Sequence, residues 1–158
     1  FFFNAFDIKY GYNILEKDSN IENYLISLEQ YLLSHNYYYN KEVILFFEYF
    51  GFNSFAGSHN VDDEKQLVLI DVQTDGVLIP PEKFVEDFSD FNIAKVIYKG
   101  KYSGQLVEDI RNNKFFLDEG AVIKGMHKGK RIAVKVKTND YMKKLKLIHK
   151  DKWKDYWE

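Results

Sequence analysis

Two lysines near the C-terminal end of the sequence have a spacing that suits anion binding. Lys135 and Lys137 belong to the run RIAVKVK, which its β-branched residues predict to be a strand. Side chains alternate between the two faces of a strand, so both lysines share one face and the apolar residues share the other, which we expect to face the core. Two neighbouring ammonium groups repel each other unless an anion such as a phosphate lies between them. The alternative is an ordinary amphipathic edge strand with its lysines in water.

A carboxylate and a third lysine precede this strand. In the run DEGAVIK, Glu119 is followed by Gly120, an apolar stretch and Lys124. If this run pairs with the strand as a hairpin, Glu119 lies beside three cations, in a position where a carboxylate can bind a divalent metal. Strict alternation would put Glu119 and Lys124 on opposite faces. We therefore expect Gly120 or the start of the strand to interrupt the pattern.

Charge is distributed unevenly along the chain. Residues 124–158 contain twelve lysine and arginine residues and four acidic residues, a local balance of +8, whereas the preceding 123 residues have a balance of −10. A segregated basic end predicts a polyanionic partner such as a phosphate or a nucleic acid. A solvated basic helix at the C-terminal end is the alternative interpretation.

The elements that position these residues follow from hydrophobic periodicity and turn signals. The patterns predict strands over 1–8, 42–50, 66–72 and 93–99, and helices over 19–34, from 80–82 onward, and over 104–112. Strands over 121–124 and 131–137, joined by a turn in which Gly129 can adopt a positive φ, predict a β-hairpin. Thr138 is expected to cap a helix that carries Tyr141 on its apolar face. The expected fold is α+β, with antiparallel sheets and flanking helices in a single domain over 1–158.

Composition excludes several classes of protein. The 158 residues are 46% hydrophobic and 29% charged, which is typical of a globular domain, and no run of about eighteen uncharged apolar residues is present to span a bilayer. The chain has no cysteine, which excludes disulfides, thiolate zinc sites and cysteine nucleophiles. We expect a cytoplasmic monomer that does not bind membranes.

Four segments occur in an order and spacing that resemble motifs of one enzyme superfamily. This is the covalent nucleotidyltransferase superfamily of ATP-dependent polynucleotide ligases and mRNA capping enzymes, and the chain looks closest to the RNA ligases. The segments are 46–51 (FFEYFG), similar to motif III; 67–72 (LVLIDV), similar to motif IIIa; 119–124 (EGAVIK), similar to motif IV; and 135–137 (KVK), similar to motif V. Each motif is weak alone, but four in the expected order indicate the adenylation domain of this family.

The resemblance implies a role for each matching residue. Glu48 would contact the ribose of ATP, and Glu119 would help to bind the catalytic Mg²⁺ or Mn²⁺. Lys124, Lys135 and Lys137 would contact the nucleotide phosphates, where cations stabilise the charge that develops as pyrophosphate leaves. The implied enzyme is an ATP-dependent RNA ligase that forms a lysyl-AMP intermediate, transfers the adenylate to a 5′-phosphate end and seals that end to a 3′-hydroxyl.

Two features of the family pattern differ in this sequence. Motif I, the K-x-D-G signature whose lysine is adenylated, is not found in that form; Lys9 in KYGYN approximates it without the aspartate, and otherwise we expect the motif upstream of Phe1, in an N-terminally incomplete domain. Leu67 and Leu69 stand where the family usually has a ring that stacks on adenine. A non-catalytic nucleic-acid-binding module derived from the same fold, and a structural domain that binds nothing specific, are the alternatives. RNA is a more expected partner than DNA.

Overall fold

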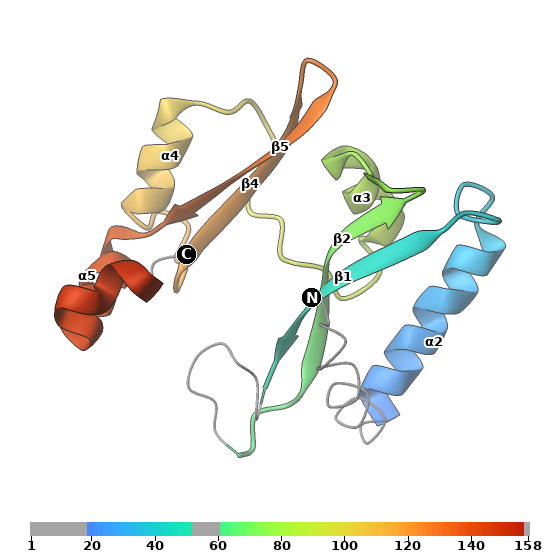
Figure 1. Ribbon diagram of the computed structural model, residues 1–158, viewed down its shortest axis with the longest axis horizontal. Helices are drawn as coiled ribbons and strands as arrows, with labels where there is room; N and C mark the ends of the chain where they lie inside the picture. The colour runs from blue at the N-terminus through green and yellow to red at the C-terminus, as the bar shows by residue number, and fades with distance from the viewer. Residues whose placement is uncertain (1–18, 52–60, 157–158) are drawn as a thin grey trace. The chain divides into compact units, whose positions relative to one another are not determined.

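The computed structural model describes residues 19–51 and 61–156 (Figure 1). The strand expected over 1–8 and the lysine Lys9 lie outside the described residues. The chain divides into two compact units, Phe1–Ala94 and Lys95–Glu158, which are described separately below. The single nucleotidyltransferase-like domain expected over 1–158 stays a prediction.

The first unit contains a small antiparallel sheet with two helices. In chain order its elements are α2 (Ser19–Ser34), β1 (Val43–Phe50), β2 (Gln66–Thr74), β3 (Val77–Leu78) and α3 (Pro81–Phe88), and the sheet has the strand order β1-β2-β3. Helix α2 is blue in Figure 1, and β1 and β2 are cyan and green. These elements confirm the helices expected over 19–34 and after Pro80 and the strands expected over 42–50 and 66–72.

A single core joins both helices to one face of this sheet. Its buried side chains come from α2, β2, α3 and the adjoining loops: Leu28, Tyr38, Leu69, Val72, Ile79, Phe84 and Phe88. Strand β1 is partly exposed along its length, because it lies at an edge of the described sheet. Of these two strands β2 is therefore the more buried, and its buried residues lie on one face.

An irregularity in β2 keeps its apolar residues on the core side. Phe46 pairs with Asp71 and Phe47 pairs with Leu69, so Ile70 is an additional residue on β2. Such a bulge changes which side chains face each side of the sheet. Leu69 before the bulge and Val72 after it are both fully buried, although three positions separate them.

The prediction of a strand over 93–99 is wrong. Ile93 makes one isolated parallel bridge with Leu69, and residues 94–99 have no regular structure. Its β-branched and aromatic residues suggested a strand, but Val96 and Tyr98 are 43% and 46% exposed. These side chains lack a surface to pack on, and β-propensity reflects packing on neighbours more than an intrinsic backbone preference.

The second unit consists of a hairpin with flanking helices. Its elements are α4 (Gly104–Arg111), β4 (Gly120–His127), β5 (Lys130–Lys137), α5 (Asn139–His149) and the 3₁₀ helix η1 (Lys150–Tyr156). Lys128 and Gly129 form the turn, with φ values of 49° and 73°, and two positive φ angles are typical of a type I′ hairpin turn. The predicted hairpin, the helix over 104–112 and the helix after Thr138 are confirmed, and both units together confirm an α+β fold with antiparallel sheets and flanking helices.

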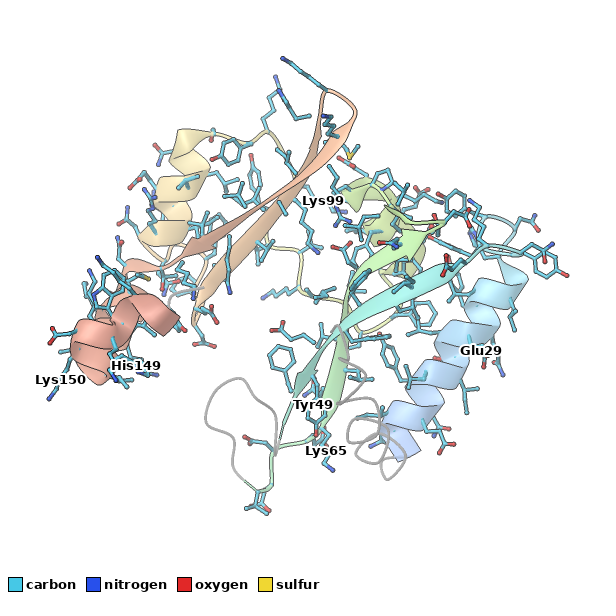
Figure 2. All side chains as sticks on the ribbon, viewed as in Figure 1. Glu29, Tyr49, Lys65, Lys99, His149 and Lys150 are labelled. Atoms are coloured by element: carbon cyan, nitrogen blue, oxygen red, sulfur yellow. The ribbon has the colours of Figure 1, made fainter. Side chains whose placement is uncertain are left out.

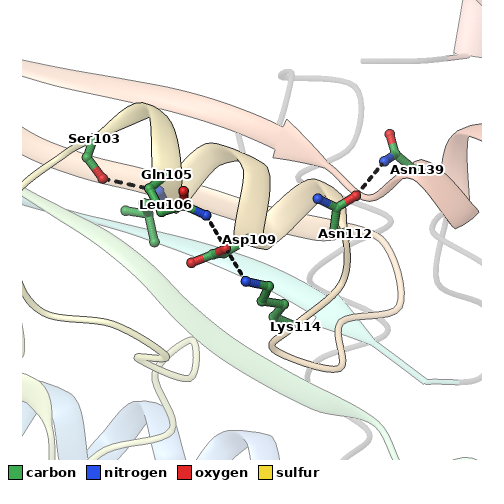
Figure 3. Close-up of polar contacts among 7 residues, drawn as sticks. All are labelled: Ser103, Gln105, Leu106, Asp109, Asn112, Lys114 and Asn139. Carbon is green, nitrogen blue, oxygen red and sulfur yellow. Dashed lines mark hydrogen bonds and ion pairs between the residues drawn. The ribbon is translucent and has the colours of Figure 1, made fainter.

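Polar contacts fix the ends of α4 and connect it to α5. The side chain of Ser103 caps α4 by accepting a hydrogen bond from the backbone N–H of Leu106, at 3.2 Å (Figure 3). At the other end of α4, the side chain of Asn139 donates to that of Asn112 at 3.3 Å. The first residue of α5 therefore contacts the residue that ends α4.

The hairpin is covered at one end only. Val136 is buried in a small core with Leu106 and Ile110 of α4, whereas Ile132 and Val134 are 44% and 39% exposed. The expectation that the whole apolar face of β5 belongs to the core is therefore wrong. The reason is length: α4 has eight residues and covers only part of the ribbon.

Within residues 19–51 and 61–156, no helix is long and apolar enough to cross a membrane.

A buried polar network ties the loop after α2 to α3. The Tyr38 hydroxyl donates a hydrogen bond to Asp87, and Lys83 Nζ lies 2.9 Å from the same carboxylate. The side chain of Asp87 is only 7% exposed. Burial, followed by the hydrogen bond to Asp87, raises the pKa of Tyr38, so the phenol stays protonated and remains a donor.

We predict that Tyr38→Phe lowers the free energy of unfolding by about 1–3 kcal/mol, because Asp87 then loses a donor while it remains buried. Urea denaturation of the purified protein measures the change. The adjacent substitution Tyr39→Phe is the control, since Tyr39 is 58% exposed and should change stability little. Equal unfolding midpoints for the two variants would contradict the structural role of Tyr38.

Candidate functional site

Three of the predicted site residues meet at one end of the hairpin. Oε1 of Glu119 lies 3.3 Å from Nζ of Lys135 and 3.1 Å from Nζ of Lys137. One carboxylate oxygen therefore lies between two ammonium groups that are two residues apart on β5. The sequence predicted an anion at this point, and here the anion is a side chain of the protein itself.

Lys124 shares the face of the hairpin that carries these lysines. In the pairing of β4 with β5, Gly120 lies opposite Lys137 and Lys124 lies opposite Ala133. Residues directly opposite each other in an antiparallel pair point to the same side, and diagonal neighbours such as Lys124 and Lys135 are typically roughly 7–8 Å apart. Arg131 lies on the same side of β5, so four cations and one carboxylate give this face a net charge of +3.

The strand start explains how Glu119 reaches this face. Strand β4 begins at Gly120, so the alternation of side chains does not extend to Glu119. The carbonyl of Glu119 accepts a hydrogen bond from the backbone N–H of Thr138, at 2.8 Å. This bond holds Glu119 beside the end of β5, as expected if the start of the strand interrupts the pattern.

Gly120 permits this close approach of the two strands. A Cβ atom at Gly120 would lie 2.1 Å from the carbonyl oxygen of Val136 and 2.7 Å from Cα of Lys137. Both distances are far below van der Waals contact, and the atoms concerned belong to the backbone. A side chain at position 120 would therefore push β4 away from β5 where Glu119 meets the lysines.

Thr138 and Tyr141 support Lys137 from the other side. Thr138 is fully buried, and its hydroxyl accepts the backbone N–H of Tyr141 at 3.1 Å, which starts α5. The Tyr141 ring centroid then lies 4.8 Å from Nζ of Lys137, a distance typical of a cation–π contact. Burial, with a further contribution from Glu119, raises the pKa of Tyr141.

From the sequence, Tyr141 is expected only to pack on the apolar face of its helix. Its position four residues after Lys137, just beyond a helix-capping threonine, is the signal in the sequence that connects it to the cluster. Lys137 is nearly buried beside this ring: its side chain is 8% exposed, against 50% for Lys135.

The ion pairs of this cluster differ in solvation. An exposed pair such as Glu119–Lys135 is typically worth about 0–1 kcal/mol, which is a small part of the stability of a domain. Lys137 is largely withdrawn from water, and a desolvated ammonium group needs an anionic or hydrogen-bonding partner. Any ligand that displaces Glu119 must supply that negative charge in its place.

The metal chemistry available at this site depends on one carboxylate. Among the described residues, no three histidine, cysteine, aspartate or glutamate side chains gather as a metal site. Mg²⁺ is commonly held by one or two carboxylates together with substrate phosphates and waters. Glu119 therefore fits a divalent cation that is shared with a bound phosphate, and it does not by itself form a closed metal site.

The predicted residues of motifs III and IIIa belong to the first unit. Glu48 is exposed on β1 opposite Val68, and Asp71 lies opposite Phe46, so both acids are on the face of the sheet that points away from its core. Leu67 and Leu69 are on the core face and are 5% and 0% exposed. Neither leucine is accessible to a nucleotide base.

A groove in the first unit contains none of the predicted residues. Its volume is about 640 Å³, and residues of α2, the loop after it and β1 line it, among them Leu25, Leu32, Tyr39 and Leu45. Figure 2 shows Glu29, another of the lining residues, on α2.

Comparison of the chain with family models, with curated proteins and with solved structures found no match. Its function is therefore inferred from the residues and their geometry, and the resemblance to RNA ligases stays a prediction.

We predict that Gly120→Ala destabilises the second unit by about 1–3 kcal/mol, as overpacking typically does, because the added methyl group meets backbone atoms of β5. Gly125→Ala is the matched control: it lies on the same strand, and a Cβ there meets nothing within 4 Å. Urea denaturation followed by circular dichroism compares the two. If both variants unfolded at the same urea concentration, the close approach at Gly120 would not matter.

Proposed function

We propose that this chain belongs to an ATP-dependent RNA ligase and that the hairpin of its second unit binds the phosphates and the divalent metal of ATP. The observation that carries the proposal is the position of Glu119 between Lys135 and Lys137, at 3.3 and 3.1 Å. The order of the four motif-like segments along the sequence supports the assignment to ligases.

The charge of the hairpin face suits a triphosphate. Lys124, Lys135 and Lys137 together supply three positive charges, and one of them is balanced by Glu119. A polyanion that takes the place of the carboxylate between the lysines gains charge-assisted hydrogen bonds, which are shorter and stronger than bonds between neutral groups. The contacts of Tyr141 and Thr138 hold Lys137 in advance, so little reorganisation is needed when the anion binds.

The proposed reaction is adenylate transfer to a lysine. The lysine nitrogen, once it has lost a proton, forms a bond to the α-phosphorus of ATP, and the bond from that phosphorus to pyrophosphate breaks. Negative charge grows on the departing phosphates. Lys135 and Lys137 would stabilise that charge electrostatically. The contact of Glu48 with the ribose, which the family resemblance implies, stays a prediction; Glu48 itself is exposed on β1.

Glu119 would exchange one cationic partner for another when the nucleotide arrives. A Mg²⁺ or Mn²⁺ ion held by Glu119 and the phosphates would neutralise charge on the nucleotide. The two lysines would then be released from Glu119 and would bind phosphate oxygens. Without a metal, the same carboxylate competes with the phosphates for the lysines and repels them.

The first functional prediction concerns lysyl-adenylate formation. In the intact protein, Lys135→Ala or Glu119→Ala should lower the rate of labelling by α-³²P-ATP about 10²–10³-fold, the usual effect of removing one group that stabilises developing charge. The label is measured after denaturing electrophoresis.

Lys130→Ala is the matched control for that experiment. Lys130 lies on the same strand and is exposed, but it pairs with His127 and so belongs to the opposite face of the hairpin. Its variant loses the same charge and should label like the wild-type protein. Wild-type labelling in Lys135→Ala would refute the proposed role of the hairpin.

The second functional prediction separates the two roles of Glu119. In Glu119→Gln, metal-free ATP should bind about tenfold more tightly than in the wild type, which corresponds to about 1.4 kcal/mol, because the competing negative charge is gone. Added Mg²⁺ should then improve binding much less than it does in the wild type. Isothermal titration calorimetry with and without EDTA measures both affinities. Weaker metal-free binding in Glu119→Gln would contradict the exchange described above.

A second candidate function is a non-catalytic nucleic-acid-binding module of the same fold. The observation that favours it is that K-x-D-G does not occur in these 158 residues. Such a module would bind RNA without ATP, and its affinity would fall steeply with salt. Binding of RNA by an intact protein that never becomes labelled by ATP would support this function over the ligase.

A further inference from the structure

A second cluster of positive charge lies on α5 and η1, outside the candidate site. Its members are exposed side chains that project from the last two helices, and we call them the α5–η1 surface: Lys143, Lys144, Lys146, Leu147, Lys150 and Lys154. Figure 2 shows Lys150 at the end of α5, extending away from the helix. Residues 143–154 contain six lysines and one acidic residue, Asp151.

The lysines of this surface are interleaved with an apolar side chain. Leu145 packs inward and is 7% exposed, whereas Leu147 is 79% exposed. Lys143 and Lys144 precede Leu147 by one helical turn, so these three lie on the outward side of α5. Lys150 is exposed immediately after the helix ends. The ion pair between Lys143 and Asp140 is largely exposed to water and neutralises little of this charge.

Two further lysines of this surface lie close to the ring of Trp153. Nζ of Lys146 lies 4.7 Å from a Trp153 ring centroid, and Nζ of Lys154 lies 5.9 Å from it. An indole ring with two ammonium groups within 6 Å combines the two features of surfaces that bind single-stranded nucleic acid. The cations contact phosphates, and the ring is able to stack on a base.

We propose that the α5–η1 surface binds single-stranded RNA through its phosphate backbone. The complementary charge of a polyanion argues for this partner, because the surface has a large excess of lysine. An anionic membrane fits less well, because interfacial helices separate a charged face from a continuous free apolar face. On α5 the exposed apolar side chains are Leu147 and Ile148, which stand among lysines, whereas Leu145 packs inward.

The position of α5 gives the surface a role in ligation, and this part rests on the proposed function. Helix α5 is capped by Thr138, the residue after Lys137, and begins at Asn139. A strand of RNA held along α5 would have its end guided toward the phosphate-binding face of the hairpin. The RNA affinity itself requires neither ATP nor adenylation, so it is measured independently of the proposed enzyme activity.

The test compares two triple variants of the intact protein. Lys144→Ala/Lys146→Ala/Lys154→Ala removes three charges from the α5–η1 surface. Lys95→Ala/Lys99→Ala/Lys101→Ala removes three exposed charges from the same unit, in the segment before α4. The probe is a fluorescent single-stranded oligoribonucleotide of about 16 nucleotides, the upper range for one binding fold, titrated without ATP at several salt concentrations.

We expect the first variant to bind RNA at least tenfold more weakly than the wild type, and the second to bind like the wild type. Each phosphate contact contributes about 0.7 to the slope of log affinity against log salt, so the slope should fall by about 2 in the first variant only. Lys144→Arg/Lys146→Arg/Lys154→Arg should retain the binding, and circular dichroism checks that all variants are folded.

Three results would overturn the proposal. The first is an equal loss of affinity in the two alanine variants, which would indicate a general effect of net charge. The second is wild-type affinity in the first variant. The third is binding of the wild type to vesicles of phosphatidylcholine and phosphatidylserine but not to the RNA, which would identify a membrane surface. Loss of RNA binding in the first variant with normal labelling by ATP separates this surface from the adenylation site.

Discussion

The organisation of the second unit depends on the repulsion between Lys135 and Lys137. Alternation along β5 places both ammonium groups on one side of the ribbon, and one of them is almost withdrawn from water. An anion must therefore lie between them, and Glu119 supplies it. The same requirement for negative charge makes the site receptive to a phosphate, because a ligand that replaces the carboxylate meets cations that are already in place.

The surrounding structure maintains that arrangement through backbone contacts. Gly120 lets β4 approach β5 closely, and the bond from Thr138 to the carbonyl of Glu119 closes the end of the hairpin. Thr138 also begins α5 and so brings the ring of Tyr141 to Lys137. Residues 137–141 thus contain the end of a strand, the cap of a helix and an aromatic ring that contacts a lysine.

The sequence was most informative where a pattern has only one structural solution. The turn at Lys128 and Gly129, the cap at Thr138 and the shared face of the two lysines were all predictable from local rules. For Glu119 the sequence left two explanations open, an interruption at Gly120 or at the start of the strand, since periodicity does not tell where a strand begins. The contact of Tyr141 with Lys137 and the burial of Lys137 depend on packing in three dimensions, which spacing alone does not specify. The prediction of a strand over 93–99 was wrong for the same reason, because spacing does not show whether a segment has neighbours to pack on.

The additional residue at Ile70 has a consequence for how the first unit can change in evolution. If β2 alternated strictly through Ile70, Asp71 would point toward α2 and α3 and Val72 would point to the other side of the sheet. Deletion of Ile70 itself would leave Leu69 and Val72 two positions apart, so both would still face the core and the strand would become regular. Deletion of Val68 would instead turn either Leu67 or Leu69 away from the core. Length variation among related sequences should accordingly be tolerated in this strand only at the bulge.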